Sequence, residues 1–217
     1  MGRSLLKMSN EELYESSLRF IFKQIDLYVE ANKEADKRHK NNSKNKGNRG
    51  EREVCKFWKE WTNYEFSRTP ASGGLRWKKA DNISSDVICT DDKHSRKFPF
   101  SIESKFYKDI RFEHILLGNK KCKILEFWDQ ANNDSIRAGK LPVLMMRYNN
   151  MPKGEFFFIV DNKVSKIING YNKLLELPIM VVVVNKNITL NVYMASDILK
   201  LPYKEIYKKV RKLLKIR

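Results

Sequence analysis

The segment 98–106 has the apolar composition of a buried strand, but it carries a glutamate and a lysine two positions apart. Because side chains alternate between the two faces of a strand, Glu103 and Lys105 project together on one face. The opposite face then carries the other side chains of the segment, which are Phe100, Ile102, Ser104 and Phe106. A shorter β segment begins at Asp86, and a hairpin between the two segments would bring Asp86 beside Glu103. The pattern therefore predicts two carboxylates and an ammonium group converging at a strand edge.

This set of charged groups suits one particular chemistry. Two carboxylates can hold a divalent cation and an ammonium beside them can bind a phosphate, so the pattern indicates a metal-dependent nuclease. Each of these residues, taken singly, could also have a plain structural role. Asp86 follows Ser84 and Ser85 and could be a turn residue, and Glu103 with Lys105 could be a solvent-facing pair on an edge strand. We assign the neighbouring acidic residues to loops, namely Asp81, Asp91 and Asp92.

The charge of the chain favours a polyanionic partner. Its 217 residues include 43 Lys and Arg against 26 Asp and Glu, which gives a formal net charge of +17. A membrane surface is the rival partner, but the longest apolar run, 177–184, is too short to span a bilayer and is broken by Pro178. We therefore expect DNA and no membrane as the partner. No signal peptide is expected, because charged sequence begins almost at Met1.

The cysteines give an expectation about location. The chain has 3 of them, scattered and without a C-x-x-C pair. We therefore expect no disulfide framework and no zinc site. Such cysteines are typical of a reducing interior, so we expect the protein in the cytoplasm of a bacterium or of a phage-infected host cell. The many Lys, Asn and Ile residues point to an AT-rich bacterial or viral genome.

Two regions are expected along the chain. Residues 1–45 read as a helix opened by the capping box Ser9–Glu12, followed by a basic linker. Residues 46–217 read as one α/β domain that ends in a helix with a basic face, beginning near Pro202. Within this domain we predict helices at 48–61 and 123–138, and strands at 64–68, 142–148, 155–160, 179–184 and 188–194.

Glu51 is a further candidate for the site. On a helix starting near Arg49 it shares an apolar stripe with Val54, Cys55 and Trp58, whereas Glu53 is expected on the opposite side with Lys56 and Glu60. A carboxylate on an apolar stripe needs a partner. A salt-bridged glutamate near the helix start would also account for this position. The aromatic residues of this helix, Phe57, Trp58 and Trp61, are predicted to be core.

The order of these motifs resembles the PD-(D/E)XK nuclease superfamily, and within it most closely the archaeal and phage-type Holliday junction resolvases. The residues that carry the resemblance are Lys46-Gly47, Glu51-Arg52, Arg68, Ser72-Gly73, Asp86, Glu103 and Lys105, with Gln130 on the following helix. The likeness covers about residues 46–148. The chain departs from the pattern in two places, with Ser85 where many members have proline and with an insertion at 75–85.

The resemblance implies a restriction-endonuclease-like α/β fold, a mixed central sheet flanked by helices, here with an N-terminal helical extension. It implies that Asp86 and Glu103 bind Mg²⁺, for which Mn²⁺ substitutes, and that Glu51 completes the metal shell directly or through water. Lys105 would orient or deprotonate the attacking water, or neutralise charge in the transition state. Ser72 with Gly73 would approach a DNA phosphate, and Gln130 would position the water or Lys105.

The resemblance further implies a homodimer that nicks Holliday junctions or other branched DNA in recombination or repair. We expect DNA contacts from Arg52, Arg68 and Gly73, and from the insertion, which contains Arg76, Trp77, Lys78 and Lys79. The basic stretch at 33–46 and the basic face of the last helix could add to them or could simply be solvated. A restriction-type or general DNA endonuclease, and a non-catalytic DNA-binding protein of the same fold, are the alternative functions.

Overall fold

The computed structural model describes residues 22–23, 43–69, 85–116, 122–171, 180–185 and 188–215. The chain divides into two compact units, and the larger one, residues 41–149 and 154–217, contains the elements discussed below. Of the predicted N-terminal helix, Phe22 and Lys23 are described and helical. The rest of that helix, the basic linker up to residue 42 and the insertion up to residue 84 lie outside the described residues.

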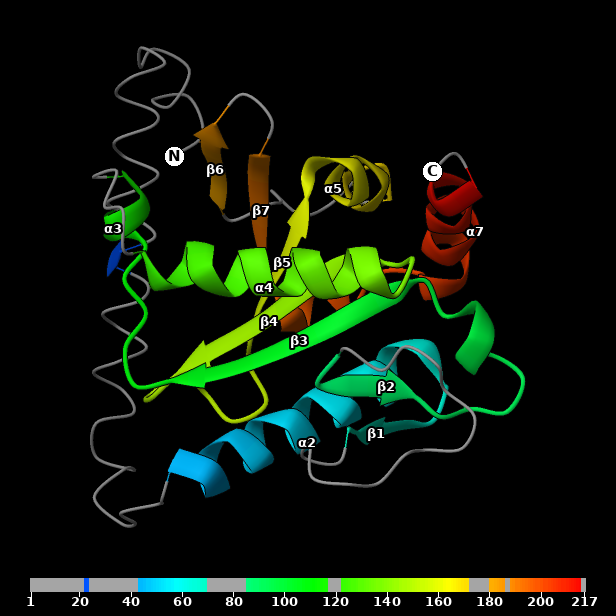
Figure 1. Cartoon of the computed structure of the whole chain (residues 1–217), viewed down its shortest axis with the longest axis horizontal. Helices are drawn as coiled ribbons and strands as arrows, with labels where there is room; N and C mark the ends of the chain where they lie inside the picture. The colour runs from blue at the N-terminus through cyan, green and yellow to red at the C-terminus, as the bar shows by residue number, and fades with distance from the viewer. Residues whose placement is uncertain are drawn as a thin grey trace, which may run out of the picture. The chain divides into compact units, whose positions relative to one another are not determined.

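The larger unit is built on a mixed sheet of seven strands (Figure 1). In spatial order they are β1 (Phe66–Arg68), β2 (Val87–Cys89), β3 (Phe100–Tyr107), β4 (Leu141–Tyr148), β5 (Phe157–Asp161), β7 (Ile188–Met194) and β6 (Met180–Asn185). Strands β3 and β4 are parallel, and the other neighbouring pairs are antiparallel. This sheet with its flanking helices confirms the predicted fold class.

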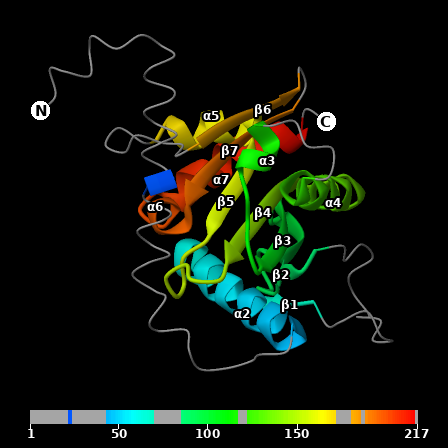
Figure 2. The ribbon, with the colours of Figure 1, turned by 90° about the vertical axis from the view of Figure 1, so that its left-hand side faces the viewer.

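Helices cover both faces of the sheet. The longer ones are α2 (Ser43–Thr62), α4 (Lys123–Arg137), α5 (Asn162–Asn169) and α7 (Tyr203–Lys215); shorter ones are α3 (Glu113–Leu116), α6 (Ala195–Ile198) and the 3₁₀ helix η2 (Ser95–Lys97). Helix α4 is the crossover that two parallel neighbours such as β3 and β4 require. Figures 1 and 2 show α2 and α4 on opposite faces of β3 and β4. In the described part of the chain, no helix is long and apolar enough to cross a bilayer.

The aromatic side of α2 forms the centre of the main core. Trp58 is fully buried and lies within 6.0 Å, between ring centroids, of Phe98, Phe100 and Phe158. The indole N–H of Trp61 donates to the carbonyl of Leu201 at 3.0 Å, next to α7. The prediction that these aromatic residues are core is confirmed. All three cysteines, Cys55, Cys89 and Cys122, are free, which agrees with the expected absence of disulfides.

Most predicted elements are present, with shifted ends. Helix α2 begins at Ser43, earlier than expected, and the strand expected at 64–68 begins at Phe66. Helix α5 was not predicted from the sequence. It is only 8 residues long, and its start is fixed by Asp161, whose carboxylate accepts from the N–H of Val164 at 2.8 Å. A pattern this short gives a weak periodic signal.

The prediction that Glu53 lies on the side of α2 opposite the buried stripe is wrong. Its side chain is only 12% exposed and forms ion pairs with Arg147 on β4 and, at 3.0 Å, with Arg49. The guanidinium carbon of Arg147 also lies 4.8 Å from the ring centroid of Phe106 and 5.5 Å from that of Phe156. Glu53 stands at the flank of the buried stripe of α2, and the sheet extends beneath that flank, so Arg147 can reach it from the strand.

Candidate active site

Pairing between β2 and β3 brings three of the predicted catalytic residues onto one face of the sheet. Val87 is opposite Ile102, and the N–H of Asp86 donates to the carbonyl of Ile102 at 3.1 Å. This register places Asp86 across from Glu103, and residues directly opposite one another share a face. The hairpin expected from the sequence is therefore present, with Asp86, Glu103 and Lys105 on the face that α4 covers.

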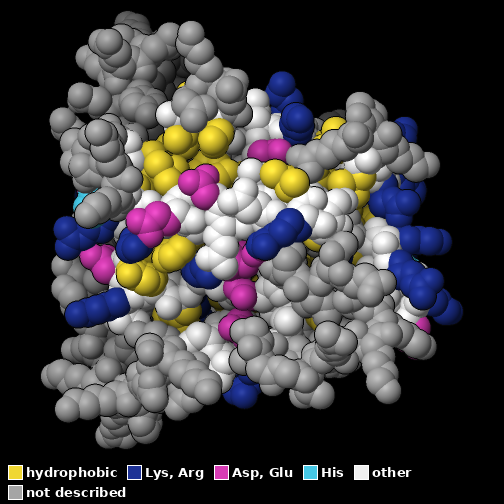
Figure 3. Space-filling view, in the orientation of Figure 1, with side chains coloured by type: hydrophobic (Ala, Val, Ile, Leu, Met, Phe, Trp, Pro, Cys, Tyr) yellow, Lys and Arg dark blue, Asp and Glu magenta, His cyan; other side chains and the backbone are white. Residues whose placement is uncertain are grey.

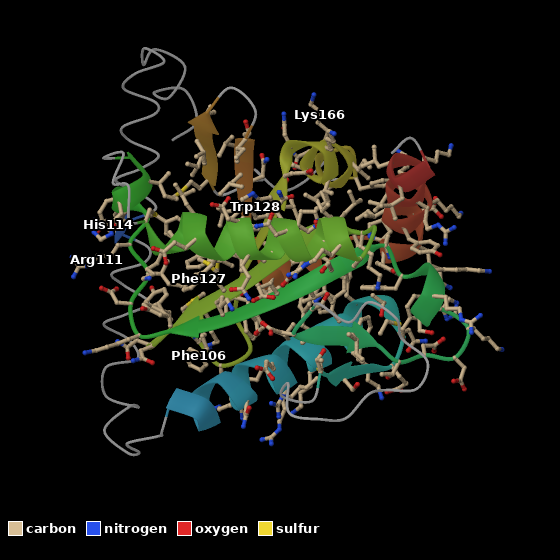
Figure 4. All side chains as sticks on the ribbon, viewed as in Figure 1. Phe106, Arg111, His114, Phe127, Trp128 and Lys166 are labelled. Atoms are coloured by element: carbon tan, nitrogen blue, oxygen red, sulfur yellow. The ribbon has the colours of Figure 1, made fainter. Side chains whose placement is uncertain are left out.

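Backbone and side-chain contacts fix each member of this trio. The Asp86 carboxylate accepts from the N–H of Ser104 at 3.0 Å, which holds it against β3. The Lys105 ammonium lies 2.6 Å from a Glu103 carboxylate oxygen and 5.6 Å from the ring centroid of Phe127 on α4. Figure 4 shows Phe127 and Phe106 on opposite sides of β3, so the α4 face and the α2 face are distinct here.

Glu103 is an unusual carboxyl group because its side chain is only 2% exposed. Burial, and after it the nearby charge of Asp86, raise its pKa to about 7, while Lys105 partly opposes the rise. The charge of Asp134 on α4 acts in the same direction as Asp86. The face therefore holds more negative charge than Lys105 offsets, and an added cation would be stabilised here.

These residues fit a magnesium ion. Carboxylate oxygens are its preferred protein ligands, and one or two carboxylates suffice when water and substrate phosphate complete the shell. Among the residues that the structure describes, no three carboxylate, imidazole or thiol groups gather closely enough to hold a metal ion. Asp86 and Glu103 would thus be the two protein carboxylates of such a site.

The pH dependence of stability should report the burial of Glu103. Between its ordinary pKa of 4.5 and its folded value of about 7, the folded protein holds a proton that the unfolded chain has released. In the wild type, the contribution of the Glu103 carboxyl to the free energy of unfolding is greatest below about pH 4.5. It is lost as the pH rises through 7. The loss is on the order of 3 kcal/mol.

Glu103→Gln removes this titration. In chelator, the variant should gain stability relative to the wild type as the pH rises from 5 to 8, as measured by urea unfolding at each pH. The difference between the two proteins isolates Glu103, because the other groups titrate in both. A difference that stays constant across this pH range would contradict the assignment.

Glu51 occupies a different place from the other two carboxylates. It pairs with Arg68 on β1 at 2.5 Å, and Arg68 also donates to the Asn48 side chain at 2.5 Å. Arg68 is opposite Val87 in the β1–β2 ladder, so both point to the α2 face. The structure does not bring Glu51 together with Asp86 and Glu103, and the salt bridge is the alternative that the sequence left open.

The remaining predicted residues are more dispersed. Arg52 and Gln130 are both exposed, and the side chain of Gln130 makes no hydrogen bond to the described part of the chain. The rest of the predicted DNA-contacting or catalytic residues lie outside the described residues: Ser72, Gly73, Arg76, Trp77, Lys78 and Lys79.

Asp134 is a site residue that was not predicted from the sequence. Its side chain is 7% exposed, forms an ion pair with Arg137 on the same helix, and raises the pKa of Glu103. Helical spacing places Asp134 on the same side of α4 as Phe127, two turns earlier. The sequence does not show that this side of α4 faces Glu103.

Comparison with known proteins identifies a family that matches most of the chain. The family described as "Phage putative PDDEXK endonuclease" matches residues 42–211, more than half of the chain. Protein D14 of Escherichia phage T5 is 24% identical over 121 residues, covering 55% of this chain and 71% of that protein. No solved structure matches the chain.

Proposed function

Because this chain belongs to that family of phage PDDEXK endonucleases, we propose that it is a divalent-metal-dependent endonuclease acting on phosphodiester bonds in DNA. The observation that supports this proposal most directly is the face shared by Asp86, Glu103 and Lys105, with the buried Glu103 carboxylate beside both a second carboxylate and an ammonium. These three residues are the proposed catalytic residues.

Asp86 and Glu103 would hold Mg²⁺, with Mn²⁺ as a substitute. When bound, the cation would supply a polarised water and neutralise charge that develops on the phosphate. The Ser104 N–H fixes one Asp86 oxygen, which leaves the other for the cation. Burial makes ionisation of the Glu103 carboxyl unfavourable and raises its pKa, and a cation beside it would lower that pKa again.

Lys105 acts next to this pair. In the free protein the Lys105 ammonium pairs with Glu103. The Lys105 side chain is 22% exposed. With a cation held by Asp86 and Glu103, the Lys105 ammonium would be available to the attacking water or to a non-bridging phosphate oxygen. Phe127 covers one side of Lys105 and limits the positions that its side chain can reach.

The proposed substrate is branched DNA, including four-way junctions, cut by a homodimer. The motif order that resembles the Holliday junction resolvases supports this choice, together with the net charge of +17. Two symmetric nicks across a junction need two active sites related by a two-fold axis, which a homodimer supplies. A contribution from Gln130, Ser72 or Glu51 to catalysis remains part of this proposal.

The test is cleavage of a synthetic four-way junction beside the matching linear duplex, each with Mg²⁺, with Mn²⁺ and with chelator. We expect paired, symmetric nicks in the junction alone and no cutting in chelator. Equal cutting of the linear duplex would instead support a restriction-type or general endonuclease. Tight binding without cutting in any metal would contradict the catalytic proposal and favour a DNA-binding protein of this fold.

A further inference from the structure

A second charged site lies at the beginning of β3, away from the carboxylate pair. It is a pocket of about 240 Å³ between η2, the α4–β4 turn and α7. Its walls are formed by Arg96, Lys97, Phe98, Ala138, Gly139, Lys140, Arg211 and Leu214. Four of these residues are cationic, and none of the described residues that line the pocket is acidic.

Three of the cations lack a described acidic partner. Arg96, Lys97 and Arg211 form no ion pair with any carboxylate in the part of the chain that the structure describes. Several basic side chains elsewhere in this protein are paired with an acid, for example Lys59 with Glu65. A convergence of like charges is unfavourable unless an anion is bound among them.

The backbone holds these groups in place. Arg211 donates to the carbonyl of Lys97 and lies close to the Tyr207 hydroxyl, each at 3.3 Å, which joins α7 to η2. Helix α4 ends in a Schellman motif. Gly139 adopts a φ of 62°, and the N–H of Lys140 donates to the backbone carbonyl of Ser135 at 2.8 Å. The pocket therefore brings together cations from three separate segments, and these contacts fix Arg211 and the backbone of Lys140.

Lys140 forms the inner wall of the pocket. Its ammonium lies 5.8 Å from the ring centroid of Phe98, and burial lowers its pKa. An anion in the pocket would offset that cost of burial. The guanidinium groups of Arg96 and Arg211 add the paired donors that match phosphate oxygens.

The distance from the pocket to Asp86 and Glu103 suggests which anion the pocket binds. Phe98 precedes Glu103 by five positions on nearly continuous extended chain, which is about 16 Å at about 3.3 Å per residue. B-form DNA advances about 3.4 Å per base pair along its axis, so a phosphate at this distance lies at most about five base pairs from the phosphate at the carboxylate pair. Figure 3 shows acidic side chains in the middle of this face and basic side chains gathered at its right edge, where Figure 1 places α7.

We propose that this pocket binds a backbone phosphate of the DNA substrate, within about five base pairs of the phosphate that is cut. The proposal rests on the proposed nuclease function, because it uses the carboxylate pair to define the cut. It assigns the pocket to fixing the position of the duplex on the enzyme. Binding through phosphate is independent of base sequence.

The test measures DNA binding without cleavage, in an Asp86→Asn background and in chelator. Arg96→Gln with Arg211→Gln should weaken junction binding about tenfold or more. The slope of log Kd against log salt should also fall by about 1, the change expected for one lost phosphate contact. The matched control is Lys163→Gln with Lys166→Gln, two exposed lysines on α5, which should leave the slope unchanged.

Each outcome decides the proposal. Unchanged affinity and slope, or an equal loss in the α5 control, would overturn it. Inorganic phosphate that raises the melting temperature of the wild type but not of the pocket variant, with DNA binding unaffected, would assign the pocket to a free phosphate and also overturn it. If the Arg211 variant fails to fold, Arg96→Gln with Lys97→Gln, both exposed on η2, makes the same test.

A failure of the nuclease proposal would show separately. The protein could cut no DNA while the slope of log Kd against log salt still falls by about 1 in the pocket variant. That result would support the phosphate pocket and contradict the catalytic assignment. Where cutting occurs, a methylphosphonate linkage at one position within about five base pairs of the mapped cut, on either strand, should weaken DNA binding by the wild type to the level of the variant. It should not weaken binding by the variant further.

Discussion

Replacing Asp86 with asparagine should reduce cleavage of the junction at least about a thousandfold, which corresponds to about 4 kcal/mol of lost transition-state stabilisation. Asparagine keeps the shape of the side chain and can still accept from the Ser104 N–H, so the β2–β3 pairing should survive. It removes one of the two carboxylate charges that would hold the cation. Single-turnover cleavage in saturating Mg²⁺ measures the effect.

DNA binding in chelator should remain within about twofold of the wild type, since Asp86 contributes no positive charge. Asp92→Asn is the matched control. It removes an exposed carboxylate from the loop after β2 and should cleave at the wild-type rate. Wild-type cleavage by Asp86→Asn, or an equal loss in the Asp92 control, would contradict the assignment of Asp86.

The second large effect concerns stability. Glu53→Ala should lower the free energy of unfolding by about 3–5 kcal/mol, the range for removing one partner of a buried ion pair. Arg147 is only 6% exposed and lies between Phe106 and Phe156, so its charge would lose the Glu53 carboxylate in a place that water reaches poorly. Urea unfolding at pH 7 measures the change.

Glu60→Ala on the same helix is the control for Glu53. Its side chain is exposed, and the substitution should change the free energy of unfolding by less than about 0.5 kcal/mol. A loss below about 1 kcal/mol for Glu53→Ala would mean that the ion pair with Arg147 contributes little to the fold. Cleavage by the folded fraction of the variant should be unchanged, because Glu53 lies on the α2 face.

The site was predictable where local rules determine it. Alternation along a strand places Glu103 and Lys105 on one face, and a hairpin brings Asp86 beside them, so a short stretch of sequence specifies the trio. The aromatic stripe of α2 was predictable for the same reason. Its periodicity reports the buried side of the helix without knowledge of the partner.

Long-range partners were not predictable in this way. Arg147 is 94 positions from Glu53, and nothing near Glu53 in the sequence indicates that a cation rises from β4 to meet it. Glu51 and Glu53 flank the buried stripe of α2 on its two sides. The partner of each depends on which strand residue lies beneath that flank, Arg68 for Glu51 and Arg147 for Glu53. Asp134 shows the same limit, because its relation to Glu103 exists only once α4 crosses over β3.

Asp86 and Glu103 together form the proposed site for a divalent cation, on which the nuclease function depends. The most direct measurement is Mn²⁺ binding by electron paramagnetic resonance, with the wild type compared with Glu103→Gln in the absence of DNA. We predict that the wild type binds Mn²⁺ at a site that the variant lacks, and that Mg²⁺ displaces the ion from it. Equal binding of Mn²⁺ by the two proteins would contradict this assignment, because the buried carboxylate would then take no part in holding the cation.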